Sequence, residues 1–160
     1  MRTFLRTLVI GTVLAVGAAT VASAASAADP AIGTWTLNLE KSKFTPGPAP
    51  KSQTRTYAAS AGGLKLTFTG VAADGSAVSG ESTYKFDGKD YPISGSPDFD
   101  TLSVTRVNSH KSTTVQKQGG KKVGTSTRTI SKDGMAMTIA GKRTNAKGAQ
   151  VNDTMVFDKQ

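Results

Sequence analysis

The stretch Gly33-Thr34-Trp35-Thr36-Leu37-Asn38-Leu39 contains the only tryptophan of the chain. Apolar and polar side chains alternate along it, so Trp35, Leu37 and Leu39 would share one face of an extended strand. An indole on an inward face buries a large apolar area. We therefore expect this segment to be a β-strand that places Trp35 at the floor of a small β-barrel.

Similar alternating patterns, rich in Thr, Ser and Val, continue to the C-terminus, and no segment has the apolar spacing of a helix. Asp-Gly and Gly-Gly pairs recur at short intervals, for example at residues 74–75 and 119–120. Both pairs tolerate the positive φ angles of tight hairpin turns. The segments between them predict strands at residues 33–39, 53–59, 64–69, 79–86, 89–94, 102–107, 112–118, 121–130, 135–140 and 150–157.

An open sheet of so many short antiparallel strands would expose two unpaired edges. Closure into an up-and-down barrel of about eight to ten strands removes both edges. Almost every connection is short enough for a hairpin, which favours pairing between consecutive strands. The sequence therefore predicts an all-β, antiparallel up-and-down barrel, and a two-sheet sandwich is the alternative that the pattern leaves open.

Residues 1–28 have the features of a secretory signal peptide. Arg2 and Arg6 precede an apolar segment over residues 8–22, and small residues then offer several cleavage points of the Ala-x-Ala kind. The apolar segment is shorter than the roughly 20 residues that a membrane-spanning helix needs. We expect cleavage after Ala27 or Ala28, with Ala24 as the alternative. One domain over residues 29–160 would then be exported to the periplasm or the extracellular space.

Cysteine is absent and the charge is unevenly distributed. Without cysteine, the chain forms no disulfide, no thiolate metal site and no cysteine nucleophile. Residues 29–100 carry seven Lys or Arg against eight Asp or Glu, whereas residues 101–160 carry eleven against three. The basic character of the folded domain therefore belongs to its second half.

Three stretches, GTWTLNLEKSKF (33–44), DGKDYPISGSPDFDTLSVTR (87–106) and SKDGMAMTIAGKRTNAKGAQVNDTMVFDKQ (131–160), resemble small exported bacterial proteins of the lipocalin-like, calycin type. More distantly, the Gly-x-Trp strand and the strand count resemble lipocalins and intracellular fatty-acid-binding proteins. This resemblance implies a barrel with a cavity for a small apolar ligand, closed at the bottom by Trp35 beneath an arginine. No arginine follows Arg143, so Arg106 or Arg128 would take that place.

Two features depart from the fatty-acid-binding proteins. Residues 40–52 are too few and too rich in proline for the two helices that form a lid in that family. The last strand carries Val156 and Phe157 where that family has an Arg-x-Tyr pair for the ligand carboxylate. The resemblance therefore does not supply a carboxylate anchor here.

Aromatic and arginine side chains would either line a cavity or fill a solid core, since small barrels do both. Arg106 shares a face with Leu102 and Val104, and an inward guanidinium would bind an anionic group. Alternatively, it lies at the rim or pairs with an internal carboxylate such as Asp153. The predicted ligand contacts are Trp35, Tyr57, Phe68, Tyr84, Phe86, Arg106 and Arg128.

Basic residues on consecutive late strands would form one contiguous wall of the barrel. This predicted basic wall consists of Lys117, Lys121, Lys122, Lys142 and Arg143. It would attract anionic lipid or polysaccharide, although strand lysines also protect edges and confer solubility. Aromatic residues for base stacking are missing from this region, so we expect no nucleic-acid partner.

No constellation of residues indicates catalysis. His110 is the only histidine and has no nucleophile beside it in a loop-like context. Asp98 and Asp100 form the best carboxylate pair, but they read as turn residues that open a strand. We expect a monomer that is not an enzyme and has no metal or cofactor. Its predicted function is to carry a small apolar or amphiphilic molecule, and the alternative is an envelope-associated module that uses the basic wall.

Overall fold

The computed structural model describes residues 28–160, in which all regular structure is β-strand. The predicted signal peptide lies outside the described residues except for Ala28. No helix among residues 28–160 is long and apolar enough to cross a membrane. The strands are β1 (Gly33–Thr45), β2 (Ser52–Ser60), β3 (Gly63–Val71), β4 (Ala77–Lys85), β5 (Asp87–Pro92), β6 (Thr101–Asn108), β7 (Lys111–Gln118), β8 (Lys121–Ile130), β9 (Ala136–Thr144) and β10 (Gln150–Lys159).

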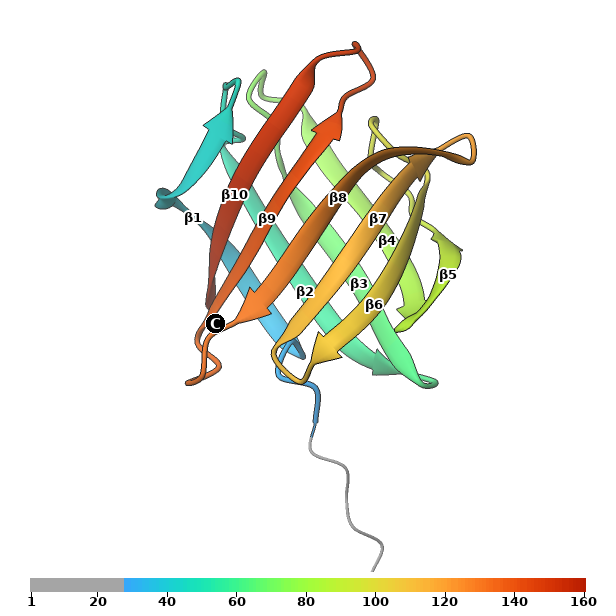
Figure 1. Ribbon diagram of the computed structural model, residues 1–160. Helices are drawn as coiled ribbons and strands as arrows, with labels where there is room; N and C mark the ends of the chain where they lie inside the picture. The colour runs from blue at the N-terminus through green and yellow to red at the C-terminus, as the bar shows by residue number, and fades with distance from the viewer. Residues whose placement is uncertain (1–27) are drawn as a thin grey trace, which may run out of the picture.

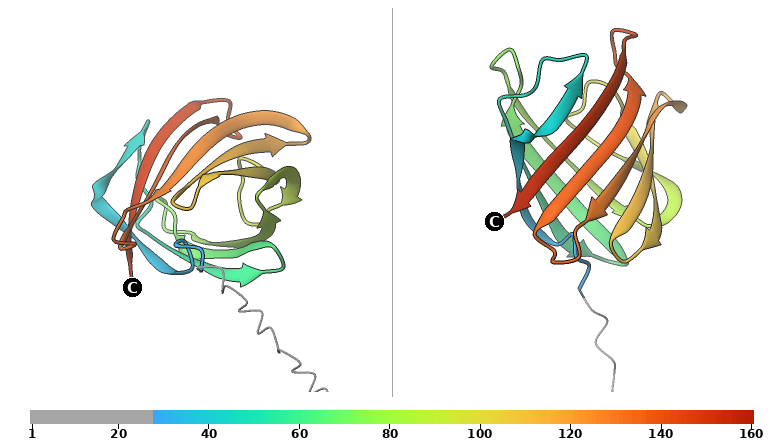
Figure 2. Two further views of the ribbon diagram at one scale, coloured as in Figure 1. Left: turned by 60° about the horizontal axis from the view of Figure 1, so that its bottom comes forward. Right: turned by 60° about the vertical axis from the view of Figure 1, so that its left-hand side comes forward.

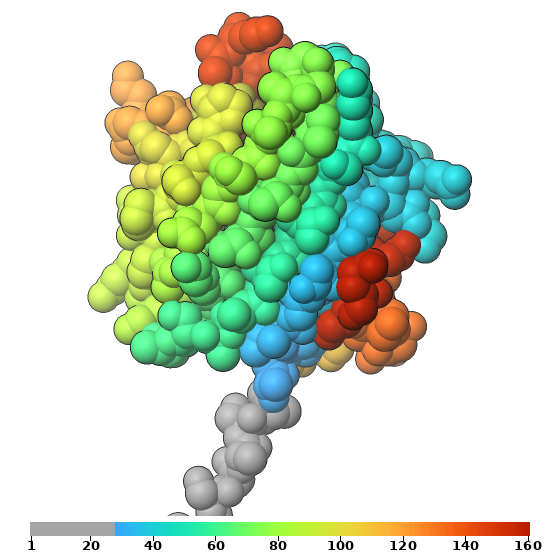
Figure 3. Space-filling view, turned by 180° about the vertical axis from the view of Figure 1, so that it is seen from behind, coloured from blue at the N-terminus to red at the C-terminus, as the bar shows by residue number. Residues whose placement is uncertain are grey.

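The strands form one ten-stranded antiparallel sheet in the order β4-β3-β2-β1-β10-β9-β8-β7-β6-β5. Consecutive strands are neighbours, and the first strand pairs with the last from Trp35↔Lys159 to Thr45↔Asn152. The sheet curls around a central space (Figures 1 and 2), and the C-terminal residues lie beside the first strand on its outer surface (Figure 3). The predicted antiparallel barrel is therefore confirmed, and the sandwich alternative is wrong.

The seam between β4 and β5 lacks a regular hydrogen-bond ladder but is held by local contacts. The Ser94 amide donates to the Glu81 carbonyl (3.0 Å), and the Ser82 hydroxyl donates to the Pro92 carbonyl (2.8 Å). A Cβ atom on Gly80 would lie 2.1 Å from the Ser94 carbonyl oxygen, so glycine permits the close approach of the two backbones. These contacts nearly complete the closure of the barrel.

The alternating strand directions give the barrel two different ends. We call one end the mouth; it contains the connections at residues 46–51, 72–76, 93–100, 119–120 and 145–149. The other end, which we call the closed end, contains residues 29–32, the remaining turns and the C-terminus, and it lies at the bottom of Figure 1. At the mouth, Gly119 and Gly120 make the β7–β8 turn with φ angles of 55° and 78°, as the Gly-Gly signal predicted.

The hydrophobic core is concentrated toward the closed end. The largest fully buried side chains are Trp35, Phe157, Leu64 and Met137, and each belongs to the closed-end half of its strand. The indole nitrogen of Trp35 donates to the carbonyl of Ala31 at 2.8 Å, and Ala31 is itself fully buried. The segment before β1 therefore packs beneath the barrel, and Trp35 lies at its floor.

Two expected apolar faces are shorter than predicted. Leu39 is 42% exposed because β1 bulges outward, so that residues 39–42 oppose only Met155 of β10. The hydroxyl of Ser42 donates to the Asn38 carbonyl (2.6 Å) and accepts from the Val156 amide (2.9 Å), which replaces ladder bonds lost in the bulge. Met135, the first residue of the predicted strand 135–140, is 54% exposed because it belongs to the turn before β9.

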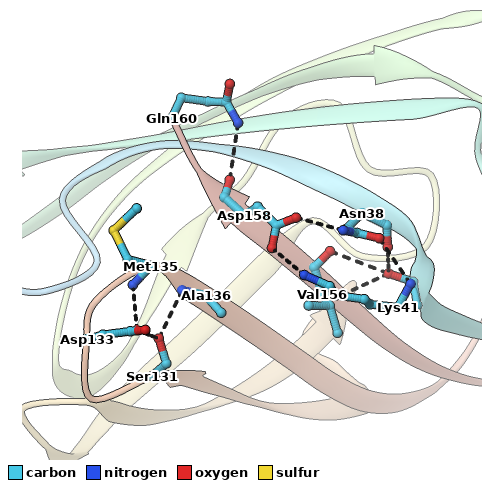
Figure 4. A network of polar contacts seen from close by, with 10 residues as sticks. Asn38, Lys41, Ser131, Asp133, Met135, Ala136, Val156, Asp158 and Gln160 are labelled. Carbon is cyan, nitrogen blue, oxygen red and sulfur yellow. Dashed lines mark hydrogen bonds and ion pairs between the residues drawn. The ribbon is translucent and has the colours of Figure 1, made fainter.

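A polar network ties the bulge to the last strand (Figure 4). Asp158 accepts hydrogen bonds from the Asn38 amide (2.7 Å) and the Lys41 ammonium (3.2 Å). These two bonds stabilise the ionised carboxylate and hold the pKa of Asp158 below its ordinary value of 3.8. The network thus adds a charge-assisted contact to the β1–β10 pairing.

Replacing Trp35 by alanine should lower the free energy of unfolding by about 3–5 kcal/mol, because a fully buried indole and its hydrogen bond are lost. Leu39→Ala, on the same strand but exposed, should cost about 0.5 kcal/mol or less. Chemical denaturation of both variants tests this. Similar losses for the two variants would contradict the role of Trp35 as the floor.

Asp158→Asn should destabilise the protein mainly above pH 3.8. The folded-state pKa of Asp158 is lowered, so its contribution is present above the unfolded value and disappears as the pH falls through the folded value. Denaturant unfolding of wild type and variant between pH 7 and pH 3 should give curves that converge in acid. A difference that is independent of pH would mean that the carboxylate charge has no part in the network.

Candidate functional site

The barrel encloses a cavity of about 590 Å³ that opens at the mouth. Its wall combines apolar side chains from opposite sides of the barrel with polar groups from the late strands. The apolar part includes Leu66, Phe68, Leu102, Val104, Ile139 and Met155. The polar part includes Ser112, Thr114, Gln116 and Ser126, so the cavity is amphipathic.

Arg128 of β8 is the central charged group of the cavity wall. It is only 9% exposed, and it has no carboxylate within ion-pair distance among residues 28–160. Its guanidinium donates to the phenol oxygen of Tyr84 at 3.1 Å and lies 4.9 Å from the ring centroid of Tyr57. Neither contact neutralises the charge, although both orient the planar group.

Arg55 of β2 supplies a second guanidinium to the cavity. It donates through Nε to the Gln53 side chain (3.0 Å) and stacks on the rings of Phe157 (5.3 Å) and Phe68 (6.0 Å). Like Arg128, it forms no ion pair within the described part of the chain. We call Arg55, Tyr57, Tyr84 and Arg128 the arginine–tyrosine cluster.

The guanidinium groups of this cluster act to lower the pKa of both tyrosines, and burial acts to raise it. Burial by itself would raise the pKa of Tyr57, but Arg55 and Arg128 stabilise its phenolate and hold the pKa below 10.0. Burial dominates at Tyr84 and raises its pKa to about 12, even though Arg128 acts in the opposite direction. The pKa of Arg128 stays above its ordinary value, because the phenol oxygens outweigh the effect of burial. Arg128 is therefore charged at neutral pH.

Three predicted ligand contacts, Trp35, Phe86 and Arg106, do not line the cavity. Arg106 lies at the closed end, where it stacks on the Phe86 ring (3.7 Å) and pairs with Asp29 (2.5 Å). The ion pair helps to hold the segment before β1 across the floor. Neither Arg106 nor Arg128 covers Trp35 as the family resemblance implied; the ammonium of Lys159 does so, at 5.1 Å from the ring centroid.

The other four predicted contacts, Tyr57, Phe68, Tyr84 and Arg128, do line the cavity. Whether they touch a ligand stays a prediction. Arg55 lies among them but was not predicted as a ligand contact. Its alternation with Tyr57 on one strand was the signal that could have identified it, because residues two apart share a face.

At the mouth, Arg143 joins two carboxylates instead of facing outward. Its Nε lies 2.7 Å from Asp98, which belongs to the β5–β6 connection, and another guanidinium nitrogen lies 3.0 Å from Asp153 of β10. The prediction that Arg143 belongs to an outer basic wall is therefore wrong. Arg143 lies on the same face of β9 as Met137 and Ile139, because residues two apart alternate together. This alternation indicated an inward position.

The remaining residues of the predicted basic wall do not form one uniform patch. Lys117 is partly buried and pairs with Asp90 (2.7 Å). Lys121, Lys122 and Lys142 are exposed and have no ion pair among residues 28–160. The last three lie on strand segments near the mouth.

The residues considered for catalysis or metal binding are dispersed. His110 lies in the β6–β7 turn, with Nδ1 3.3 Å from the Ile130 carbonyl oxygen. Asp100 directly precedes β6, and its carboxylate accepts from the Gly119 amide of the β7–β8 turn (2.9 Å), a bond that lowers its pKa. Asp98 pairs with Arg143. Residues 28–160 contain no cluster of three or more side chains placed to hold a metal ion.

Three solved structures that are similar to this chain share 10–12% of its sequence. The chain is similar to the zebrafish ileal bile acid-binding protein in complex with cholic acid (TM-score 0.47, 11% identity, 82% of this chain and 99% of that chain covered). It is also similar to a redesigned β-barrel, mFAP1, bound to DFHBI (TM-score 0.44, 12% identity, 81% of this chain and 95% of that chain covered). A third similar structure is that of the siderocalin Ex-FABP (TM-score 0.38, 10% identity, 82% of this chain and 71% of that chain covered). No protein-family model and no curated protein sequence matches the chain. The resemblance to exported bacterial proteins stays a prediction.

The three tyrosines should titrate separately in alkaline solution. Tyr57 should ionise below pH 10.0, Tyr84 near pH 12, and Tyr91 above 10.0, because burial and the hydrogen bond to Asp87 raise its pKa. Absorbance titration of the folded protein measures this. Tyr57→Phe should remove the first step and lower the pKa of Tyr84, which the Tyr57 phenolate raises, and Arg55→Met should move the first step to higher pH.

A first step that persists in Tyr57→Phe would contradict this assignment of the cluster. Circular dichroism at each pH checks that the barrel stays folded during the titration.

Proposed function

We propose that this protein is an exported carrier or scavenger that binds a small apolar or amphiphilic molecule inside its barrel. Export follows from the predicted signal peptide. The observation that carries the proposal is a cavity of about 590 Å³ with a buried guanidinium that has no carboxylate partner among residues 28–160. The cavity volume falls within the range of about 300–1,000 Å³ that is typical of small-molecule sites.

The charge of the cluster favours an amphiphile with an anionic group. Burying an unpaired charge costs free energy, and a guanidinium offers five donors of which Arg128 commits only one to Tyr84. A carboxylate, sulfate or phosphate group near Arg128 and Arg55 would accept several charge-assisted hydrogen bonds. It would also compensate two positive charges at once.

The apolar part of the cavity wall supports an orientation in which the anionic group of the ligand lies at the arginine–tyrosine cluster. The arginine–tyrosine cluster lies toward the closed end, since Tyr57, Tyr84 and Arg128 are in the closed-end halves of their strands. Leu66, Phe68, Ile139 and Met155 surround the space beside it, and Phe44 and Phe99 lie nearer the mouth. An anionic group at the cluster would therefore leave the apolar part of the ligand along this wall.

The alternative function is binding to anionic lipid or polysaccharide of an envelope through exposed lysines. Lys121, Lys122 and Lys142, near the mouth, support it. Such binding would fall steeply with salt, because these charges are exposed and screened. It would not depend on groups inside the barrel.

Calorimetric titration with dodecanoate and dodecanol separates the two proposals. Wild type should bind the acid more tightly than the alcohol, which has the same chain but no charge. Arg128→Met should weaken dodecanoate binding about 10- to 100-fold and leave dodecanol binding nearly unchanged, because the lost hydrogen bonds involve charged groups. The charge reversals Lys121→Glu and Lys122→Glu are the matched controls and should have little effect.

The opposite result, with Arg128→Met silent and charge reversal abolishing binding to anionic vesicles, would favour the envelope module. Absence of binding to both probes, together with a bare mass in native mass spectrometry of protein purified from its export compartment, would contradict the carrier proposal. Mass that solvent extraction removes would support it and would identify the ligand.

A further inference from the structure

The mouth of the cavity is crossed by a connection that is anchored at both ends. This segment, residues 93–100 between β5 and β6, is called the strap below. Its base is closed by the Ile93 amide, which donates to the Asp100 carbonyl (3.0 Å), and by the Asp100 amide, which donates to the Lys117 carbonyl (3.0 Å). The residues between these bonds are therefore held as a loop that projects over the mouth.

The tip of the strap contacts strands that are not its neighbours in the sheet. Asp98 pairs with Arg143 of β9 (2.7 Å) and accepts from the Ala146 amide in the β9–β10 turn (3.1 Å). In the sheet order, β7 and β8 lie between β6 and β9. The strap thus reaches past two strands at the rim, and Pro97 and Phe99 line the cavity beneath it.

Other routes into the cavity are obstructed by protein. The closed end is covered by residues 29–32 and the Trp35 floor, with Ala31 fully buried. The β4–β5 seam is closed near the mouth by the Ser94–Glu81 and Ser82–Pro92 hydrogen bonds. A ligand therefore has to pass the mouth, where the strap lies.

Arg143 has two carboxylate partners, so the strap can open without leaving the guanidinium charge unpaired. Burial alone would lower the pKa of Arg143, but its hydrogen bonds to Asp98 and Asp153 raise it above the ordinary value. When Asp98 leaves, Asp153 still pairs with Arg143, and the Asp98 carboxylate becomes hydrated. Gly95, with a φ of 77°, lies against β4, where a Cβ atom would come within 1.9 Å of the Ser79 carbonyl oxygen. It therefore anchors the base of the strap and leaves residues 96–99 as the part that opens.

We propose that the strap is a lid, and that the Asp98–Arg143–Asp153 bridge is the latch that limits how fast ligands enter and leave the cavity. This inference concerns the regulation of the cavity and rests on the proposed function. The latch acts on rates more than on affinity. Opening precedes both binding and release, so a weaker latch accelerates both steps.

Stopped-flow fluorescence with the anionic amphiphile 1-anilinonaphthalene-8-sulfonate measures these rates. Asp98→Asn should raise the association and dissociation rate constants together by about five- to tenfold and change Kd by less than about twofold. The matched control is Asp74→Asn, which makes the same charge change at the mouth in a turn where the Asp74 carboxylate accepts hydrogen bonds from Ser76. It should leave both rate constants unchanged.

A reversible lock provides the second test. The chain has no cysteine, so the double substitution Asp98→Cys and Ala146→Cys introduces a unique pair between the strap tip and the β9–β10 turn. Oxidation of this pair should slow association and dissociation by at least about tenfold, and reduction should restore them. Mass spectrometry confirms that the disulfide has formed.

The possible outcomes distinguish a failure of the lid proposal from a failure of the carrier proposal. Probe binding with rate constants unchanged by both Asp98→Asn and the oxidised lock would overturn the lid and leave the carrier intact. Equal acceleration by Asp98→Asn and Asp74→Asn, with a silent lock, would show that only net charge matters and would also overturn the lid. Failure of wild type to bind any amphiphile would overturn the carrier, and the lid with it.

Discussion

The antiparallel pairing of β1 with β10 is the constraint on which the rest of the structure depends. It joins residues from the two ends of the folded domain, from Trp35↔Lys159 to Thr45↔Asn152, and turns a meander into a barrel. The entropic cost of closing so long a loop grows only slowly with its length, so many ladder hydrogen bonds can offset it. The same pairing brings Lys159 over the Trp35 ring and Asp158 to Asn38 and Lys41. An open sheet would have neither the floor nor the cavity.

Closure also divides the interior into two unequal parts. The closed-end part holds Trp35, Phe157, Leu64 and Met137, which are the largest fully buried side chains among residues 28–160. The cavity extends from this packed floor to the mouth, with Ser, Thr and Gln side chains in its wall, and this part of the interior gains less from burial. A stable floor therefore supports a less densely packed half. This division allows a barrel without disulfides to keep a large internal space.

Whether an arginine of the barrel has a carboxylate partner depends on its position between the floor and the mouth. Arg106 at the floor and Arg143 at the mouth both have carboxylate partners, Asp29 for the first and Asp98 and Asp153 for the second. Arg55 and Arg128 lie between these two arginines, and within residues 28–160 their partners are aromatic rings and neutral hydrogen-bond acceptors. The unpaired charges therefore lie where the cavity lies. This coincidence links the electrostatics of the fold to the proposed amphiphile.

By itself, the sequence determined the strands, most turns and the closed topology, because alternation and Asp-Gly or Gly-Gly turns act through neighbouring residues. The alternation also predicted inward positions for Tyr57, Tyr84 and Arg128, whereas Arg143, which has the same parity as Met137 and Ile139, was wrongly assigned to the outer wall. Only the tertiary structure decided which distant groups meet: Lys159 over Trp35, Asp29 with Arg106, and Asp98 with Arg143. Those contacts depend on the register at closure and on the path of the strap, and neither leaves a local pattern in the chain. For the same reason Leu39 is exposed, since the bulge in β1 is defined only against its partner β10.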